Sequence, residues 1–327
     1  MQTFRTELKP QKASFNIDYQ CFTLGIGSCF TENIGAKLNA RQLPFFHNPF
    51  GIVYNPLSMA RQLAMISESD TSVEQENASY FFKEKDLIKQ GNLWHSMQHH
   101  GRFSGENSDL VLKNINGSLN EARLFFQKTN RLILTFGTAR VFEFKTTKEI
   151  VANCHKLPSS YFQSKKLTVA SIVDNFKPIF EKIFSEKTGF HIILTVSPIR
   201  HVRDGLVENN RSKAILLLAC EVLSEMFNHV HYFPAYELVM DDLRDYRFYE
   251  RDMLHPNIQA IEYIWQYFET TFFDERTKNV EAEVEKINLM QAHRPLHGSD
   301  TEGYQKFQKQ LEEKILNIKK QYPFLHF

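Results

Sequence analysis

The sequence predicts an α/β protein, a three-layer α/β/α sandwich around a central, mainly parallel sheet of about five strands. Two kinds of segment support this prediction. One is short apolar runs rich in β-branched and aromatic residues, and the other is the longer segments with helical periodicity that lie between them. Because strands and helices alternate along the chain, we expect parallel strands joined by right-handed crossovers, with helices on both faces of the sheet.

The expected strands are apolar runs bounded by turn or polar residues, as is typical of buried strands in an α/β sheet. The first run ends in glycines, and the others are bounded by polar or turn residues. In chain order, the five strands are residues 21–27, 43–46, 131–136, 190–196 and 229–233.

The expected helices carry apolar residues at three- and four-residue spacing. The last of them starts with a proline, which suits the first turn of a helix. In chain order, the helices are residues 31–42, 56–66, 119–128, 169–183, 211–227 and 256–272.

One stretch departs from this alternation. Residues 69–118 are polar and interrupted, and they contain a histidine-rich run at 94–104. Because long loops are often functional, we expect this insertion to cap a cleft.

The end of the chain has a different pattern. Charged amphipathic helices are expected over 280–290 and 301–320. The chain therefore divides into an α/β domain, 1–273, and a C-terminal helical extension, 274–327. The extension either packs back on the domain or forms a surface for homo-oligomers.

Composition excludes several classes of protein. The 39 Lys and Arg residues balance the 38 Asp and Glu residues, whereas nucleic-acid-binding domains usually carry a basic face. No stretch approaches the ~18 apolar residues of a membrane helix, and the N-terminus lacks the apolar core of a secretion signal. The four cysteines have no CxxC spacing. We therefore expect a cytoplasmic protein with reduced thiols and without nucleic-acid or membrane partners.

Ser28 stands where a predicted strand meets a predicted helix. There it projects from the carboxyl edge of the sheet, at a helix N-terminus whose free N–H groups stabilise developing negative charge. Near the other end of the chain, Asp252 and His255 are three residues apart, so one loop can supply a base and the carboxylate that orients it. This arrangement predicts a Ser28–His255–Asp252 catalytic triad.

Each of these residues also has a simpler interpretation. Ser28 can serve only as the cap of its helix, and Asp252 can cap a loop in which His255 is solvated. Cys29 is an alternative nucleophile, although its place in the motif points it into the core.

The motifs of the chain carry a family resemblance. Gly27-Ser28-Cys29-Phe30 is the motif after which the GSCFA family is named, and the chain is identified as a member of that family. The resemblance spans about residues 20–270. Further segments that carry it are 48–56, 135–139, 151–156, 195–201 and 232–256.

The GSCFA family resembles the SGNH (GDSL-like) hydrolases, a group of three-layer α/β/α proteins in which a serine and an Asp-x-x-His pair cleave or transfer acyl groups. The resemblance implies that Ser28 is the nucleophile, Asp252 the acid and His255 the base. It also implies an oxyanion hole formed by the backbone N–H groups of Ser28 and Gly51. The position of the oxyanion-binding asparagine of that group is Ala139 here, whose side chain cannot donate a hydrogen bond.

The departure at Ala139 leaves one oxyanion donor to be identified. Asn153, Asn48 and Thr138 are the candidates, or else the hole is weaker. Losing one donor typically removes ~3–4 kcal/mol of transition-state stabilisation, so activity need not vanish. Gly51 itself can instead be a glycine that only permits a turn.

Several residues near the expected cleft are candidates for substrate binding. Arg200 and His201 follow the carboxyl end of a strand and suit an anionic substrate, or else Arg200 forms a salt bridge inside the fold. His95 is either substrate-facing or solvated. The spacing of His95, His99 and His100 suggests a metal site, but no carboxylate or cysteine pattern completes it, so neither a metal nor a cofactor is expected.

Two functions follow from the sequence. The first is a serine esterase or acyltransferase acting on an acylated small molecule or sugar, for example a cell-envelope precursor. The second is a non-catalytic or weakly active ligand-binding protein that keeps the same fold. Ala139, at the position of the oxyanion-binding asparagine, favours the second function, whereas the Ser28, Asp252 and His255 set favours the first.

Overall fold

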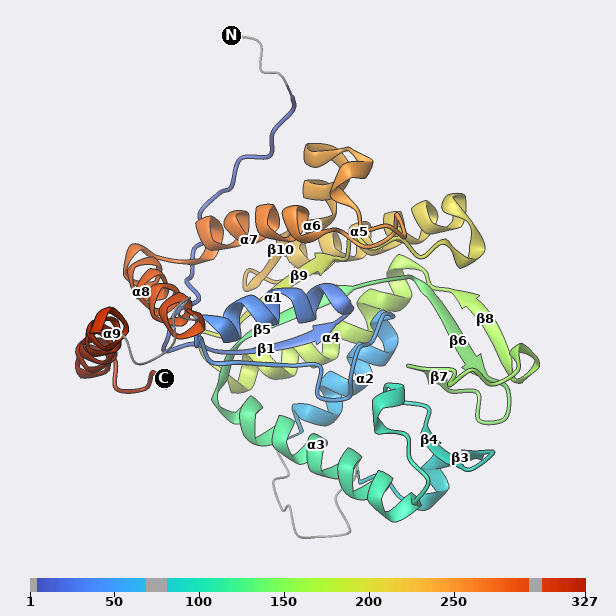
Figure 1. The fold of residues 1–327 in the computed structure, drawn as a ribbon. Coiled ribbons are helices and arrows are strands. Elements are labelled where there is room, and N and C mark those ends of the chain that lie inside the picture. Colours follow the sequence, from blue (N-terminus) through green and yellow to red (C-terminus); the bar gives the residue numbers. More distant parts are fainter. Residues whose placement is uncertain (1–4, 69–80, 294–301) are drawn as a thin grey trace.

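The computed structural model describes residues 5–68, 81–293 and 302–327. At its centre lies a five-stranded sheet in which every neighbouring pair is parallel, with strand order β10-β9-β5-β1-β2 (Figure 1). The predicted fold class is therefore confirmed. Its strands are β1 (Phe22–Gly27), β2 (Phe45–His47), β5 (Thr129–Phe136), β9 (His191–Val196) and β10 (Val230–Phe233).

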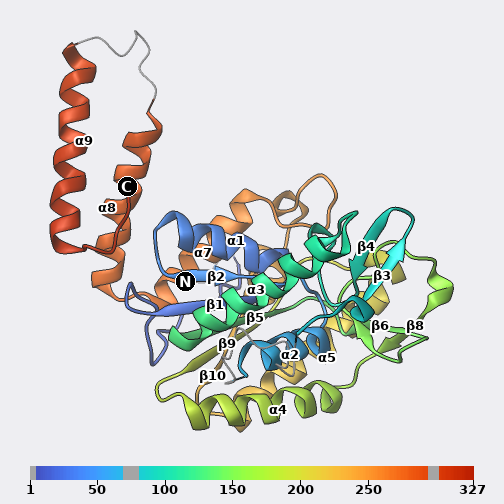
Figure 2. The same cartoon turned by 90° about the horizontal axis from the view of Figure 1, so that it is seen from below.

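Helices cover both faces of the sheet (Figures 1 and 2). One apolar core joins one face to four helices: α2 (Pro56–Ile66), α3 (Ser108–Lys128), α4 (Val169–Glu186) and α5 (Leu206–Met226). A second core joins the other face to α1 (Cys29–Ala40) and α7 (Ile258–Phe272).

Strand β5 shows why the sheet needs two apolar layers. Leu132 and Leu134 belong to the first core, whereas Ile133 between them belongs to the second. Successive side chains of a strand point to opposite faces, so an apolar run is buried only when both faces are covered.

Some expected helix boundaries were wrong. Helix α3 begins at Ser108, inside the stretch expected to be a loop, because Asn107 accepts a hydrogen bond from the N–H of Leu110 and caps the helix. Helix α7 begins after Asn257, which caps it. Pro256 therefore precedes the helix, and it forms an isolated antiparallel bridge with Tyr249.

Two small antiparallel sheets flank the carboxyl ends of the central strands. The first is a hairpin of β3 (Leu87–Gln90) and β4 (Leu93–Ser96) within the 69–118 insertion, of which residues 69–80 lie outside the described residues. The second has the order β7-β6-β8, and the sequence did not predict it. It consists of β6 (Arg140–Phe144), β7 (Ile150–Val151) and β8 (Phe162–Lys166).

The segment between β10 and α7 contains the short helix α6 (Ala235–Glu237), which continues into a π-helical segment, Leu238–Leu243. At the C-terminus, α8 (Glu275–Ala292) and α9 (Glu302–Gln321) form a pair that extends from one end of the molecule (Figure 2). Buried residues of α8 belong to the same core as α1 and α7, so the extension packs back on the domain. None of the helices in the described ranges is long and apolar enough to cross a lipid bilayer.

Candidate active site

Ser28 lies at the junction of β1 and α1. Its Oγ accepts a hydrogen bond from the N–H of Phe30 at 3.3 Å, and its own N–H donates to the carbonyl of Thr135 in β5 at 3.4 Å. The residue is completely buried. In this structure Ser28 therefore caps α1, as the simpler interpretation of the sequence expects.

Gly27 determines how closely Ser28 approaches β5. A Cβ atom at Gly27 would lie 2.6 Å from the Thr135 carbonyl oxygen and 2.6 Å from Thr31 Oγ1. No larger residue fits this space without displacing β5 or α1, so a glycine is needed immediately before Ser28.

Asp252 and His255 form a pair in the loop before α7. His255 Nδ1 and Asp252 Oδ2 are 2.6 Å apart, and Asp252 Oδ1 accepts the N–H groups of Leu254 and His255 at 2.8 and 3.0 Å. These hydrogen bonds lower the pKa of Asp252 to about 2, because all of them favour the carboxylate. Both side chains are nearly half exposed.

The loop that carries this pair is attached to the segment after β9. The N–H of Arg200 donates to the carbonyl of Leu254 at 3.3 Å, and the Arg200 guanidinium lies 4.5 Å from the centre of the Tyr249 ring. The Asp252–His255 pair is thus held at the carboxyl edge of the sheet, the same edge at which Ser28 lies.

Tyr54 contacts both Cys29, which follows Ser28, and His201, which follows β9. The Tyr54 hydroxyl lies 3.7 Å from Cys29 Sγ, and its ring contacts the His201 ring edge-on at 5.3 Å. Burial, Lys213 and His255 together lower the pKa of His201 to about 4. His201 is therefore neutral near pH 7.

The structure does not join the expected triad through hydrogen bonds. Within the described ranges, Ser28 and His255 make no hydrogen bond with each other, and His255 Nε2 has no hydrogen-bond partner. Ser28 and His255 lie at the same edge of the sheet, but the hydrogen bond that Ser28 Oγ accepts comes from Phe30, and His255 bonds to Asp252.

The expected oxyanion donors are also engaged in other bonds. The N–H of Gly51 donates to the carbonyl of Asn48 at 2.8 Å, just as the N–H of Ser28 donates to Thr135. Gly51 is required by the backbone, because its φ is +82° and a Cβ would lie 2.2 Å from His100 Cβ. The backbone conformation of this turn is therefore sufficient to explain why residue 51 is a glycine.

Asn48 holds the strand end beside Ser28. Its Oδ1 accepts the N–H of Gly27 at 2.8 Å, while its Nδ2 is buried without a hydrogen-bond partner among the described residues. Asn153 accepts the N–H of His155 through Oδ1 at 2.9 Å. The Nδ2 of Asn153 makes no hydrogen bond with any residue that the structure describes. Each asparagine thus has one amide donor available.

Thr138 and Ala139 are held by helix α5. Thr138 Oγ1 lies 3.1 Å from Ser212 Oγ and accepts the N–H of Arg140, and the N–H of Ala139 donates to Ser212 Oγ at 2.7 Å. Ala139 is fully buried in the core. The hydroxyl of Thr138 therefore has a structural role here.

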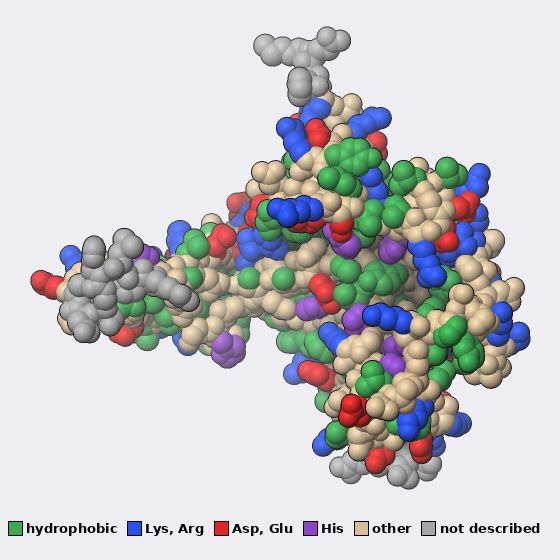
Figure 3. All heavy atoms as spheres, turned by 45° about the vertical axis from the view of Figure 1, so that its right-hand side comes forward, with side chains coloured by type: hydrophobic (Ala, Val, Ile, Leu, Met, Phe, Trp, Pro, Cys, Tyr) green, Lys and Arg blue, Asp and Glu red, His purple; other side chains and the backbone are tan. Residues whose placement is uncertain are grey.

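Two histidines of the insertion, His95 and His99, form hydrogen bonds with serines of the same segment. His95 Nδ1 lies 2.7 Å from Ser104 Oγ, and its ring lies 4.6 Å from that of His155. Buried His99 bonds to Ser96 Oγ at 2.8 Å. Among the described residues, no group of three or more His, Cys, Asp or Glu side chains is placed to hold a metal ion. Figure 3 shows several histidine side chains around a hollow in the middle of one face.

One buried residue of this region, Lys213, was not predicted from the sequence. Lys213 of α5 is 1% exposed and donates hydrogen bonds to the carbonyls of Gly137 and Ser197, which follow β5 and β9. Burial lowers its pKa to about 7. Its position on the buried face of α5, in register with Leu216 and Cys220, was the available signal.

The fold and site define an α/β protein with a parallel sheet, whose carboxyl edge carries a buried serine and an exposed Asp–His pair. Residues 23–268 match the GSCFA family, and residues 284–327 match the C-terminal domain of GSCFA domain proteins. The chain therefore belongs to the GSCFA family.

Other comparisons are more distant. No curated protein matches the chain. A solved structure from Streptococcus pneumonia, provisionally described as a platelet activating factor, is 14% identical with a TM-score of 0.30. The match covers 49% of this chain and 65% of that one, so the chain spans less than two thirds of that structure's length.

Proposed function

We propose that this chain is a serine-dependent ester hydrolase or acyltransferase that acts on an acylated small molecule or sugar. The observation that supports it best is the 2.6 Å contact between His255 Nδ1 and Asp252 Oδ2. This contact fixes the imidazole tautomer and leaves Nε2 available to accept a proton, as a general base requires. The proposal also agrees with the resemblance of the family to the SGNH hydrolases.

In the proposed reaction, Ser28 Oγ attacks the acyl carbonyl while His255 takes its proton. Asp252 stays ionised throughout the neutral range and stabilises the imidazolium, because its pKa lies near 2. The ester C–O bond then breaks and His255 gives the proton to the departing alcohol oxygen, which leaves the acyl group on Ser28. Water or an acceptor hydroxyl next attacks this acyl group while His255 takes its proton, and His255 returns that proton to Ser28 Oγ as the acyl group leaves. The Ser28 O–H must therefore donate to His255 Nε2 for catalysis, and the bond that Ser28 Oγ accepts from the N–H of Phe30 does not prevent this.

We assign the missing oxyanion donor to Asn48. Within the part of the chain that the structure describes, its Nδ2 is buried without a hydrogen-bond partner, and its Oδ1 accepts the N–H of Gly27, the residue before Ser28. A buried amide donor without an acceptor is unfavourable in the resting protein by about 1–3 kcal/mol, and a developing oxyanion would satisfy it. Asn153 is the second candidate, because its Nδ2 is also available.

The burial of Ser28 and its bond from Phe30 favour a second function. In this alternative, the chain is a ligand-binding protein in which Ser28 serves only as the helix cap. The two functions differ in whether substitution of Ser28 affects turnover of an ester.

Hydrolysis of p-nitrophenyl acetate and butyrate separates them. The catalytic proposal expects Ser28→Ala and His255→Gln to lower kcat/KM by about 10³-fold or more, with folding retained by circular dichroism. Asp245→Asn is the matched control, because Asp245 lies in the same loop region and its side chain is half exposed. Hydrolysis that persists in Ser28→Ala would refute the nucleophile assignment, and no hydrolysis in any variant would favour the ligand-binding alternative.

We also propose that the protein is cytoplasmic. All four cysteines, Cys21, Cys29, Cys154 and Cys220, carry free thiols, which agrees with a reducing cytoplasm. We likewise propose a small-molecule acyl substrate as the partner of the site.

A further inference from the structure

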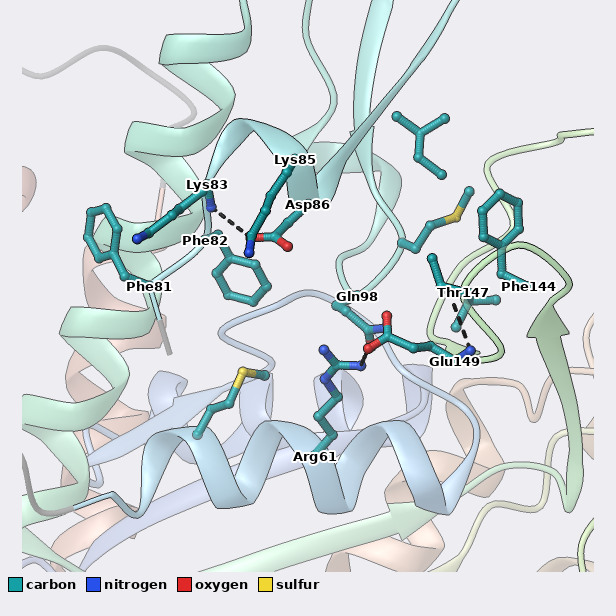
Figure 4. A pocket seen from close by; sticks show the side chains of 14 residues that line it. Arg61, Phe81, Phe82, Lys83, Lys85, Asp86, Gln98, Phe144, Thr147 and Glu149 are labelled. Carbon is teal, nitrogen blue, oxygen red and sulfur yellow. Dashed lines mark hydrogen bonds and ion pairs between the residues drawn. The ribbon is translucent and has the colours of Figure 1, made fainter. Parts of the chain in front are cut away.

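One cavity of the molecule is lined by residues other than those of the candidate active site. It has a volume of about 440 Å³, within the range of small-molecule pockets. Helix α2 forms one wall, and the segments around the two small sheets form the others (Figure 4). None of its lining residues is Ser28, Asp252 or His255.

Much of the lining of the cavity is apolar. Phe82 and Met97 are buried, and Ile88 and Val151 come from the two small sheets. The other half of the lining is polar or charged, so the cavity suits a ligand that has both an apolar part and a polar part. The apolar lining residues are Met65, Phe81, Phe82, Ile88, Met97, Phe144 and Val151.

The walls are held in place by hydrogen bonds, so the cavity is formed before any ligand binds. Asn116 of α3 holds the backbone of Phe82 with two bonds of 2.9 Å. Gln98 Nε2 donates to the carbonyl of Ile150 at 3.1 Å. Such preorganisation reduces the entropy lost on binding.

Positively charged side chains outnumber negatively charged ones among the residues that line the cavity. Glu149 pairs with Arg61 at 3.1 Å, and Asp86 accepts the backbone N–H of Lys83 at 2.8 Å. Among the residues that the structure describes, the ammonium of Lys85 has no ion pair or hydrogen bond. Figure 4 shows Lys85 beside Phe82, across the cavity from the Arg61–Glu149 pair. A cation beside an apolar wall suits a ligand with an apolar chain and one negative charge.

We propose that this cavity binds an amphiphilic carboxylate, an acyl chain of medium length that ends in a carboxylate, with the chain against Phe82 and Met97 and the carboxylate at Lys85. The proposal does not depend on Ser28 chemistry, because the two sites share no residue. It assigns the chain a second ligand site.

Calorimetric titration of the full chain with sodium octanoate tests it. One molecule is expected to bind per chain, while sodium acetate does not bind and octan-1-ol binds more weakly than octanoate. Lys85→Gln is expected to weaken octanoate binding by about fivefold or more, and Ile88→Asp more strongly, because it replaces part of the apolar lining with a carboxylate.

Lys89→Gln is the matched control. Lys89 lies on β3 near Lys85, but it stacks on Trp94 and does not line the cavity. Its octanoate affinity should therefore equal that of the unmodified chain. The proposal fails if octanoate does not bind, if Lys85→Gln binds it as tightly as Lys89→Gln does, or if octan-1-ol binds as tightly as octanoate.

Discussion

At the scale of single residues, Lys213 joins the sheet to the candidate site. Its ammonium donates to Gly137 O at 2.7 Å and Ser197 O at 2.6 Å, and so holds together the chain segments that follow β5 and β9. A neutral amine has enough N–H groups to donate both bonds. Burial can therefore lower the pKa of Lys213 to about 7 without loss of this link.

We predict that Lys213→Met destabilises the protein by about 2 kcal/mol at pH 9, because it leaves two buried carbonyl groups unpaired. The pKa of Lys213 falls from an ordinary value of 10.5 to about 7 on folding, so the unfolded chain binds the extra proton between these values. The stability of the unmodified protein relative to Lys213→Met should consequently rise with pH from about 7 to 10.5 and be smallest below pH 7.

Urea unfolding at pH 6, 8 and 10 measures this difference. Lys182→Met is a control on an exposed helix surface, where Lys182 pairs only with Glu186 at 4.0 Å. If the stability difference for Lys213→Met does not change with pH, the lowered pKa is wrong.

Contacts between near neighbours could be predicted from the sequence at this scale. Asp252 and His255 contact each other because three residues of one loop separate them, so no distant part of the fold is involved. The position of the Ser28 hydroxyl could not be predicted. It depends on the side-chain rotamer of Ser28 and on the placement of a loop 227 positions further along the chain, which local sequence does not determine.

At the scale of elements, Arg41 connects the C-terminal helices to the domain. It follows α1 and pairs with Glu281 at 3.1 Å and Glu269 at 3.5 Å, and its guanidinium lies 4.7 Å from the centre of the Trp265 ring. Glu269 and Glu281 are mostly buried, and burial next to Glu269 raises the pKa of Glu281. The positive charge of Arg41 therefore compensates the negative charges of these two carboxylates.

We predict that Arg41→Ala lowers the free energy of unfolding by about 3 kcal/mol at pH 8, because it leaves these carboxylates without their cation. Glu281 binds its proton more tightly in the folded state, so stability is retained at low pH and lost as the pH rises through its folded pKa. The loss in Arg41→Ala should therefore be smaller at pH 5 than at pH 8.

Urea unfolding at the two pH values checks this prediction. In Lys278→Ala, which removes an ion pair with the exposed Glu275, stability should change by less than about 0.5 kcal/mol. An Arg41→Ala variant as stable as Lys278→Ala at pH 8 would show that Arg41 does not anchor the extension.

Periodicity made the larger elements predictable. Helix α2 was predicted at its observed bounds, because Asn55 and Pro56 mark its start and its apolar spacing is regular. The sheet of β6, β7 and β8 was missed because β8 is mostly exposed and polar after Phe162. Strands β7 and β8 form because they pair with β6, and a local sequence pattern does not reveal such pairing.

At the scale of the whole molecule, the parallel sheet brings together segments from the two ends of the chain. Ser28 follows β1, whereas His201 and the loop of His255 lie beyond β9, and all of them lie at one edge. The alternation of strands and helices predicts this meeting, because parallel strands direct all their carboxyl ends to the same edge. It does not predict the distances between side chains, which depend on loops and small sheets.

The central claim is that Ser28 forms a covalent acyl intermediate. Intact-protein mass spectrometry after incubation with a fluorophosphonate tests it most directly, with peptide mapping to locate the adduct. We predict one adduct on Ser28, formed more slowly in His255→Gln and at an unchanged rate in Asp245→Asn. An adduct that survives in Ser28→Ala, or an unlabelled protein that still hydrolyses esters, would contradict the claim.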